Sequence, residues 1–414
     1  MDIVSCGTIN DTKTLLADLL SDYNINVRPV ANQSQAVNVT VQAYIKSIQE
    51  FDEVQGKFSF IGAFSMMWHD VNMIWNPALY GGVQDVTLLY PNVWIPELIL
   101  LSPSDDVDRL GQKWNRIRYL FQGEAVWIPI DLIESTCSVN IRNYPFDRQK
   151  CVTSFHCLGY NDYEVQLIAA SDKFSLDVYQ ENSIWSIEKT KVTVFHSGAG
   201  SQIDLIIYLK RKPSFVIINV VTPILFLSLL NVLVFFLIPE SGERVSYCIT
   251  VLLAIAVFMT IVSDMLPRSS EPVPIISFKL MMDMIISSCI VFVAIQNLNW
   301  YYRDDSVPIP LWLKSAYKRL SCTCCCRRKV ISNSIEMNRM NKKNNTRTIR
   351  VNDLENDPIE KKISRLVDEH IETEVTWKKL SQMMDWVALL CFTVASVLNY
   401  VIFLAIIAVG SSQV

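Results

Sequence analysis

One stretch of the chain carries residues whose types and spacing suit the passage of cations. Ser246, Thr250, Leu253, Val257, Ile261 and Asp264 recur every three or four residues and therefore share one face of a helix. Glu243 lies 21 residues before Asp264, about 31 Å along a helix. Carboxylates at the two ends of such a face attract cations and repel anions. Ser246 or Thr250 alone would suit an ordinary membrane helix, but the whole set favours a pore-lining face.

A pore-lining helix needs a membrane, and the composition provides for one. Of the 414 residues, 50% are hydrophobic and 19% are charged, against about 25% charged in soluble proteins. The mean hydropathy is +0.24. Four long uncharged runs are Ser214–Ile238, Val245–Ser263, Met284–Tyr302 and Trp386–Val409. Because about 20 helical residues span a bilayer core, we predict transmembrane helices at about 214–238, 243–265, 275–299 and 384–410.

The charge distribution predicts the orientation. Residues 1–213 hold 17 Lys+Arg and 24 Asp+Glu, whereas residues 300–383 hold 17 and 11. The basic segment 300–383 is therefore expected in the cytoplasm, with residues 1–213 and the C-terminus outside a multi-pass plasma-membrane protein. This orientation would place three basic residues just outside the first span, where basic residues are not expected: Lys210, Arg211 and Lys212. Carboxylates of the outer domain would have to neutralise them. The net charge of −4 gives no basic surface for nucleic acid. No leader follows Met1, as expected if a mature chain had gained a methionine.

Residues 1–213 are predicted to form an extracellular all-β sandwich with an N-terminal helix. Stretches such as Val37–Ile48 and Phe58–Trp68 are rich in β-branched and aromatic residues, and turn formers separate them. Leucines at helical spacing from Leu15 to Leu20 follow Asn10-Asp11-Thr12 and indicate the helix. Three sequons predict glycosylation at Asn10, Asn32 and Asn38.

The cysteines divide between the compartments. Four lie in the outer block, and spacing alone allows three pairings among Cys6, Cys137, Cys151 and Cys157. Four more lie in the basic segment, at Cys322, Cys324, Cys325 and Cys326. Palmitoylation and reduced exposed thiols are both open for that cluster, while zinc is disfavoured because no second ligand cluster exists. The four histidines are scattered, so we expect no enzyme, no metal site and no cofactor.

Several motifs together resemble one family. Cys137 and Cys151 enclose 13 residues that include Tyr144-Pro145-Phe146-Asp147, ahead of four spans. Asn219–Pro223 resembles the first span of the Cys-loop receptors, and Glu240–Arg244 with the following helix resembles the pore segment of nicotinic acetylcholine receptors. The resemblance covers nearly the whole chain, least in 321–357. It implies a Cys137–Cys151 disulfide and a homo- or hetero-pentameric channel, in which Leu253 and Val257 form rings that act as the gate.

The resemblance also implies residues that couple the outer domain to the pore. Arg211 precedes Pro223 by 12 residues, as the pre-membrane arginine of the family does, and Glu53 matches an acidic residue in the first outer hairpin. Pro145, Phe146 and Asp147 would meet the linker Pro267–Pro274. An Arg211–Glu53 pair is expected, with a static salt bridge as the simpler alternative to a coupling role.

The family's agonist positions are altered in this chain. A quaternary ammonium needs several aromatic faces around it, but the aromatic positions of the family hold Ala63, Leu101 and Leu158. The loop from Phe195 to Gly200 lacks the adjacent cysteine pair. Tyr160 and Phe195 remain as rings, and Trp94 is expected in the core. We therefore predict a cation-selective subunit with an unknown small-molecule agonist other than acetylcholine; whether divalent cations pass is open.

Two alternatives are kept: a complementary subunit of a heteromeric nicotinic-like receptor, and a non-conducting surface receptor or scaffold. In the cytoplasmic segment 300–383, Pro308–Leu320 is predicted as an amphipathic helix on the membrane surface. Residues 327–357 are predicted to be disordered. A helix from Pro358 is expected to run into the last span.

Overall fold

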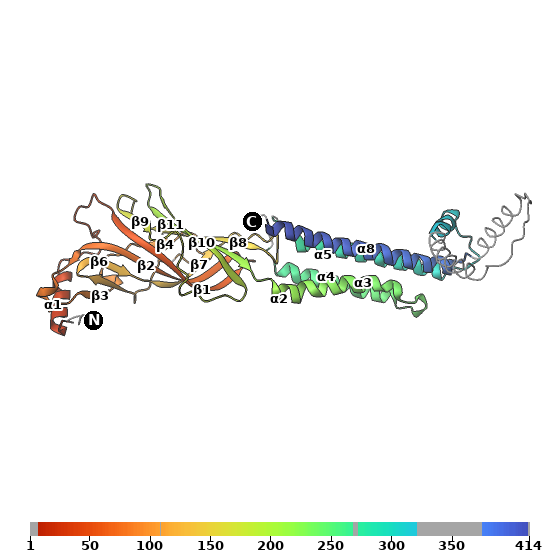
Figure 1. Cartoon of the computed structure of the whole chain (residues 1–414), viewed down its shortest axis with the longest axis horizontal. Helices are drawn as coiled ribbons and strands as arrows, with labels where there is room; N and C mark the ends of the chain where they lie inside the picture. The colour runs from red at the N-terminus through yellow and green to blue at the C-terminus, as the bar shows by residue number, and fades with distance from the viewer. Residues whose placement is uncertain (1–6, 108, 268–271, 321–374, 413–414) are drawn as a thin grey trace, which may run out of the picture. The chain divides into compact units, whose positions relative to one another are not determined.

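The computed structural model describes residues 7–107, 109–267, 272–320 and 375–412. These residues belong to two compact units (Figure 1). The first comprises Met1–Val221, Ile261–Ser277 and Ala405–Val414, and the second comprises Thr222–Thr260 and Phe278–Leu404. The cysteine cluster Cys322–Cys326, the predicted disordered stretch and the helix expected from Pro358 lie outside the described residues.

The first unit is dominated by two β-sheets, in the strand orders β3-β5-β6-β2-β1-β9, with β7 also on β2, and β10-β11-β8-β4. All pairings are antiparallel except β1 with β9. The larger sheet contains β1 (Val37–Asp52), β2 (Lys57–Ile74), β3 (Asp85–Leu89), β5 (Arg116–Leu120), β6 (Gln122–Trp127), β7 (Ile130–Thr136) and β9 (Val165–Ala169). The smaller contains β4 (Leu98–Leu100), β8 (Arg148–Cys157), β10 (Trp185–His196) and β11 (Ser201–Arg211). The predicted sandwich is thereby confirmed.

Alternating side chains explain why these segments pair. In β1, Val37, Val39 and Val41 are buried, while Asn38 between them is exposed. Such alternation buries one face of a strand and leaves the other to solvent. The buried faces of both sheets contribute to one hydrophobic core.

A disulfide connects the two sheets near one end. Cys137 directly follows β7 and Cys151 lies in β8, and their Cα atoms are 5.1 Å apart across the bond. The pairing that the family resemblance implied is confirmed. Cys157 is a buried free thiol, and Cys6 lies outside the described residues.

The N-terminal helix α1 (Ile9–Leu20) begins earlier than the sequence suggested. Thr8 caps it: the Thr8 side chain accepts from the Asp11 backbone, and the Asp11 side chain accepts from the Thr8 backbone. This reciprocal arrangement satisfies two free donors of the first turn. Asn10, expected to precede the helix, lies within its first turn and is exposed.

Four helical segments are long and apolar enough to cross a membrane, as predicted. The first, Ser214–Phe236, contains α2 (Ser214–Val216), a π-helical turn at Ile217–Val221, α3 (Thr222–Val232) and a short 3-10 turn. The π turn has a local cause, because Pro223 has no backbone N–H and its ring displaces the carbonyl of Asn219. The others are α4 (Arg244–Asp264), α5 (Ile275–Tyr301) and α8 (Trp377–Ser412).

The start of α8 packs against the segment that follows α5. Residues 311–320 are helical. Leu313 on that helix packs with Trp377 and Leu380, and the Trp377 indole donates to the carbonyl of Val307 over 2.9 Å. Leu311 and Trp312 are exposed. The helix therefore presents apolar surface both to α8 and away from it.

A buried ion pair lies within the apolar part of α5. The Lys279 and Asp283 side chains are 4% and 5% exposed, one helical turn apart, and form a salt bridge. Asp283 also accepts from Asn399 of α8 over 2.8 Å and from Ser228 of α3 over 3.2 Å. A lone charge among hydrocarbon is costly, but this one is paired and hydrogen-bonded. Asp283 thus joins three helices through one carboxylate.

We predict that Asp283→Leu is more damaging than Lys279→Leu/Asp283→Leu. The single change leaves the Lys279 ammonium buried without a counter-charge, a loss of about 3–5 kcal/mol when a buried pair is broken, whereas removing both charges costs less. Surface expression and thermal melting of the detergent-purified chain measure the difference. Asn399→Leu, which removes one neutral donor, is the milder control. Equal damage from the single and double changes would contradict the prediction.

Candidate functional site

The predicted pore-lining residues form a continuous exposed face of α4. Glu243, Ser246, Thr250, Leu253, Val257, Ile261 and Asp264 are all exposed in the single chain. Leu253 is 63% exposed and Val257 49% in the single chain. The opposite face is buried, through residues such as Cys248, Val251 and Ile255. The face bearing the predicted residues is therefore the one left free.

The positive and negative charges at the start of α4 lie in different surroundings. Arg244, although adjacent to Glu243, is 2% exposed and forms a two-pronged contact with Asp385 at 2.9 and 2.8 Å. Asn297 also donates to Asp385. Because Arg244 is bound to Asp385, the exposed Glu243 keeps its charge available at the helix start. Asp264 is the last residue of the helix.

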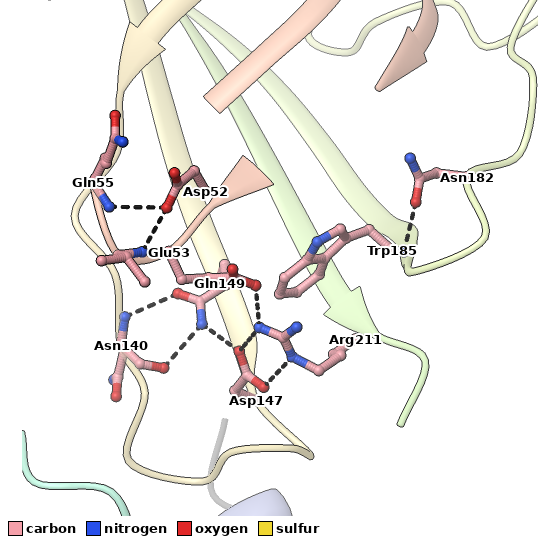
Figure 2. Close-up of polar contacts among 10 residues, drawn as sticks. Asp52, Glu53, Gln55, Asn140, Asp147, Gln149, Asn182, Trp185 and Arg211 are labelled. Atoms are coloured by element: carbon pink, nitrogen blue, oxygen red, sulfur yellow. Dashed lines mark hydrogen bonds and ion pairs between the residues drawn. The ribbon is translucent and has the colours of Figure 1, made fainter. Parts of the chain in front are cut away.

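Arg211, at the end of β11, lies at the centre of a polar cluster (Figure 2). Its Nε donates to Asp147 Oδ1 over 2.7 Å, and its Nη2 donates to Asp147 Oδ2 over 3.2 Å and to Glu53. The guanidinium also lies 4.2 Å from the centroid of the Trp185 ring and 5.0 Å from that of Tyr144. The expected Arg211–Glu53 contact is present, but the two-pronged, more buried partner is Asp147.

The cluster allows the Arg211 guanidinium to stay protonated although it is buried. The Arg211 and Asp147 side chains are 6% and 1% exposed. Burial lowers the pKa of the Arg211 guanidinium, but Asp147 and Glu53 raise it by more, so the net pKa lies above its usual value. Arg211 is therefore charged throughout the physiological pH range.

Neighbouring amides hold Asp147 in place. Gln149 donates to Asp147 Oδ2 and to the carbonyl of Asn140, and accepts from the Asn140 backbone (Figure 2). The next basic residue, Lys212, lies 3.5 Å from Glu181. Two members of the basic triplet thus have carboxylate partners, as the predicted orientation requires.

The loop closed by the disulfide reaches the end of the linker before α5. The backbone N–H of Ile275, the first residue of α5, donates to the carbonyl of Arg142 over 3.0 Å. Pro145 is buried and Phe146 partly so. Asp147, expected from the family resemblance to meet this linker, instead lies inside the Arg211 cluster. Arg142 was not identified from the sequence, because nothing in a motif marks a backbone carbonyl.

The predicted agonist-site residues lie in several elements. Leu101 is hydrogen-bonded through its backbone to Ser154, and Leu158 to Glu97, so they flank opposite ends of the β4–β8 pairing. Both are exposed, as is Phe195 on β10. Ala63 lies in the other sheet, opposite Ile130 of β7. No aromatic ring occupies position 63, 101 or 158.

Trp94 belongs to the core. It is 2% exposed, and its ring lies 5.9 Å from that of Trp68 and 6.1 Å from that of Tyr160. Its indole N–H donates to the Tyr160 hydroxyl over 2.9 Å. Tyr160 is partly buried and contacts the core through this bond, whereas Phe195 is exposed.

The hairpin between β10 and β11 is held to the segment after β8. The backbone N–H of Gly198 donates to Asp162 Oδ2 over 2.9 Å. The exposed Tyr163 has its hydroxyl 3.5 Å from the point where a Cβ on Gly198 would lie. Sequence reasoning missed Tyr163, because its closeness to the hairpin depends on the fold. Tyr163 is thus a second exposed ring near the β10–β11 hairpin, in addition to Phe195.

The three sequon asparagines, Asn10, Asn32 and Asn38, are exposed and therefore accessible to modification. Within the described residues, no group of three or more His, Cys, Asp or Glu side chains is arranged to hold a metal ion.

We predict that Arg211→Gln destabilises the chain by about 3–5 kcal/mol, because it leaves the buried Asp147 carboxylate without a counter-charge. Thermal melting of the purified full chain and its surface expression report the loss. The matched control is Lys212→Gln, which removes a partly exposed charge and should be nearly silent. Adding Asp147→Asn to Arg211→Gln should restore part of the loss, and a fully stable single variant would refute the structural role.

Comparison with known proteins agrees with this architecture. Residues 12–213 match the neurotransmitter-gated ion-channel ligand binding domain, and residues 220–365 match the neurotransmitter-gated ion-channel transmembrane region. The chain is 29% identical over 309 residues to the neuronal acetylcholine receptor subunit alpha-3 of Rattus norvegicus, covering 73% of this chain and 62% of the relative.

Two further relatives match with similar identity and coverage. Subunit alpha-6 of Homo sapiens is 30% identical over 325 residues, covering 77% and 65% of the two chains. Subunit beta-2 of Carassius auratus is 29% identical over 301 residues, covering 71% and 65%. The chain thus matches somewhat less than two thirds of the length of these relatives. With its disulfide-closed loop, sandwich and four apolar helices, the chain belongs to the neurotransmitter-gated ion-channel (Cys-loop receptor) family and is nicotinic-like.

Proposed function

We propose that this chain is a subunit of a pentameric, ligand-gated, cation-selective channel in the plasma membrane. The observation that carries the proposal is the exposed face of α4, which begins at Glu243 and ends at Asp264. In a ring of five copies, each position on that face becomes a ring of five side chains. The N-terminal sandwich and the C-terminus would lie outside the cell, and residues 300–383 inside. No catalytic step is proposed.

Electrostatics favour cations over anions in such a pore. Glu243 and Asp264 would place a ring of carboxylates at each mouth, and Arg244 would not offset the inner ring because it pairs with Asp385. Carboxylate rings raise the local cation concentration and lower that of anions. Between them, the Leu253 and Val257 rings provide an apolar constriction that blocks ions when it dewets.

The first functional prediction concerns the inner mouth. Glu243→Gln removes one charge per copy and should lower the preference for cations over anions roughly tenfold, because local ion concentration follows the potential of the mouth. Reversal potentials under a salt gradient measure this in a conducting variant. Glu243→Asp, which retains the charge, is the control. An unchanged reversal potential for Glu243→Gln would exclude this ring as the selectivity element.

The second prediction concerns the gate. Leu253→Thr should produce openings without agonist, because a hydroxyl lets water enter the constriction. Whole-cell current at rest and single-channel recording detect such openings. Leu252→Thr, at a neighbouring position off the predicted face, is the control. A silent Leu253→Thr channel with demonstrated surface expression would count against the gate assignment.

We infer that the agonist is a small molecule other than acetylcholine. Ala63, Leu101 and Leu158 offer no aromatic face, so these three positions cannot form a cation–π cage around a quaternary ammonium. The exposed rings of Phe195 and Tyr163 beside the β10–β11 hairpin are the aromatic contribution of this region. A ligand screen on the Leu253→Thr background would identify the agonist.

Transmission from the outer domain to the pore would use the Arg211 cluster and the disulfide-closed loop. Glu53 and Asp147 would hold Arg211 directly before the first span, while Pro145 and Phe146 belong to the loop whose Arg142 carbonyl receives the Ile275 N–H. A displacement of that loop would be passed to the linker bounded by Pro267 and Pro274. The opposing hypothesis is a static anchor, in which Glu53→Gln alters stability but not agonist sensitivity.

The second candidate is a complementary subunit of a heteromeric nicotinic-like receptor, favoured by the missing aromatic positions. Co-expression with a nicotinic acetylcholine receptor subunit separates the two, because a complementary subunit would yield agonist responses only in the mixture. A non-conducting receptor is disfavoured by the intact polar and acidic positions of the α4 face.

A further inference from the structure

The connection between the first and second spans, residues 237–243, accepts three hydrogen bonds from side chains of other residues. The Tyr301 hydroxyl, in the last residue of α5, donates to Glu240 Oε1 over 2.5 Å. The adjacent Tyr302 hydroxyl donates to the carbonyl of Pro239 over 3.2 Å. Arg244 Nε donates to the carbonyl of Leu237 over 2.8 Å. A short connection held in this way has little freedom to shift.

The connection also has a defined internal shape that aims Glu243. Residues Pro239–Ser241 form a 3-10 turn, and Gly242 follows with φ of +71°, a conformation that glycine adopts at little cost. The Glu243 carbonyl accepts the Tyr247 N–H over 2.9 Å, so Glu243 stands at the N-cap of α4. The direction of its side chain is therefore set by the turn that Glu240 begins.

Glu240 and Glu243 are both carboxylates of this connection, but the structure gives them different surroundings. Both side chains are exposed, but they differ in their contacts, because Glu240 Oε1 accepts the Tyr301 hydroxyl. The Lys378 ammonium lies 5.3 Å from the centre of the same Tyr301 ring and adds a positive charge on that side. Glu240 is thus directed toward α5 and the start of α8.

We propose that Tyr301 is a positioning residue for ion selectivity: it anchors Glu240 as a structural acceptor and thereby fixes the ring formed by Glu243. Glu240 is not itself a member of that ring. The inference rests on the proposed function, because it concerns the selectivity of the same pore. Its essential element is the hydrogen bond between the Tyr301 hydroxyl and Glu240, which a phenylalanine cannot donate.

The test compares four variants on the Leu253→Thr background. Tyr301→Phe removes only the hydroxyl and should lower cation-over-anion permeability at least threefold, as should Glu240→Ala. Glu240→Gln keeps an oxygen that accepts from Tyr301 and should leave selectivity unchanged. Glu243→Gln is the reference for loss of the ring. Surface biotinylation of each variant verifies that the channels reach the membrane.

Either of two selectivity results overturns the inference. Unchanged selectivity in Tyr301→Phe would show that the anchor is unnecessary. A loss in Glu240→Gln equal to that in Glu243→Gln would show that Glu240 acts through its charge as a ring member.

A second readout separates failure of this inference from failure of the proposed function. A cysteine introduced by Glu243→Cys is modified with a charged methanethiosulfonate reagent from the cytoplasmic side, with the unaltered Glu243 chain as the control for the native thiols. Adding Tyr301→Phe should change the modification rate at least threefold, while adding Glu240→Gln should not. If Glu243→Gln leaves selectivity intact, the proposed selectivity element fails, and an unchanged rate in Tyr301→Phe would independently refute the anchor.

Discussion

A guanidinium buried at the end of β11 is the constraint around which the first unit is organised. Burying a cation carries an unfavourable desolvation free energy, which nearby carboxylates and aromatic faces offset. For Arg211, these partners are Asp147, Glu53 and Trp185. These come from the disulfide-closed loop, the β1–β2 turn and the first residue of β10. Because α2 begins three residues after Arg211, the start of the first span is tied to both loops.

The second unit follows the same rule with different partners. Lys279 pairs with Asp283, and Arg244 with Asp385, so the basic residues buried between helices are matched by acids from the same or a neighbouring helix. These pairs lie on the inward side of the bundle. The pairs neutralise the charged side chains that lie among apolar residues. Neither pair covers the exposed face of α4. The exposed face is then free to serve contacts with other copies and with ions, rather than the stability of a single chain.

The features predictable from the sequence were those encoded by composition and period. Long uncharged runs gave the four apolar helices, and three- and four-residue spacing gave the exposed face of α4. The disulfide came from the family resemblance, because spacing alone left three pairings. Contacts between distant residues were less accessible. Glu53 was expected near Arg211, whereas Asp147, the two-pronged partner, was expected to meet the linker Pro267–Pro274. The direction of a loop carboxylate cannot be predicted from the sequence.

The same limit applied at finer scale. The sequence pattern does not single out Thr8 as the cap of α1, because Asn10, Asp11 and Thr12 are also capping types. Tyr301 and Glu240 are 61 residues apart, and no pattern connects them. The ligand region is a different case, because the absent aromatic residues were visible in the sequence. What replaces them, the closeness of Tyr163 to Gly198, depends on how the β10–β11 hairpin folds back.

The buried free thiol of Cys157 has a chemical consequence. Burial raises its pKa to about 12, and the nearby Glu97 adds to the shift. Since only the thiolate is nucleophilic, the raised pKa of Cys157 lowers its reactivity at neutral pH. In the proposed extracellular placement of this domain, an accessible cysteine would be open to disulfide formation with other thiols. Here the core keeps it inert, so the residue behaves as a small apolar side chain.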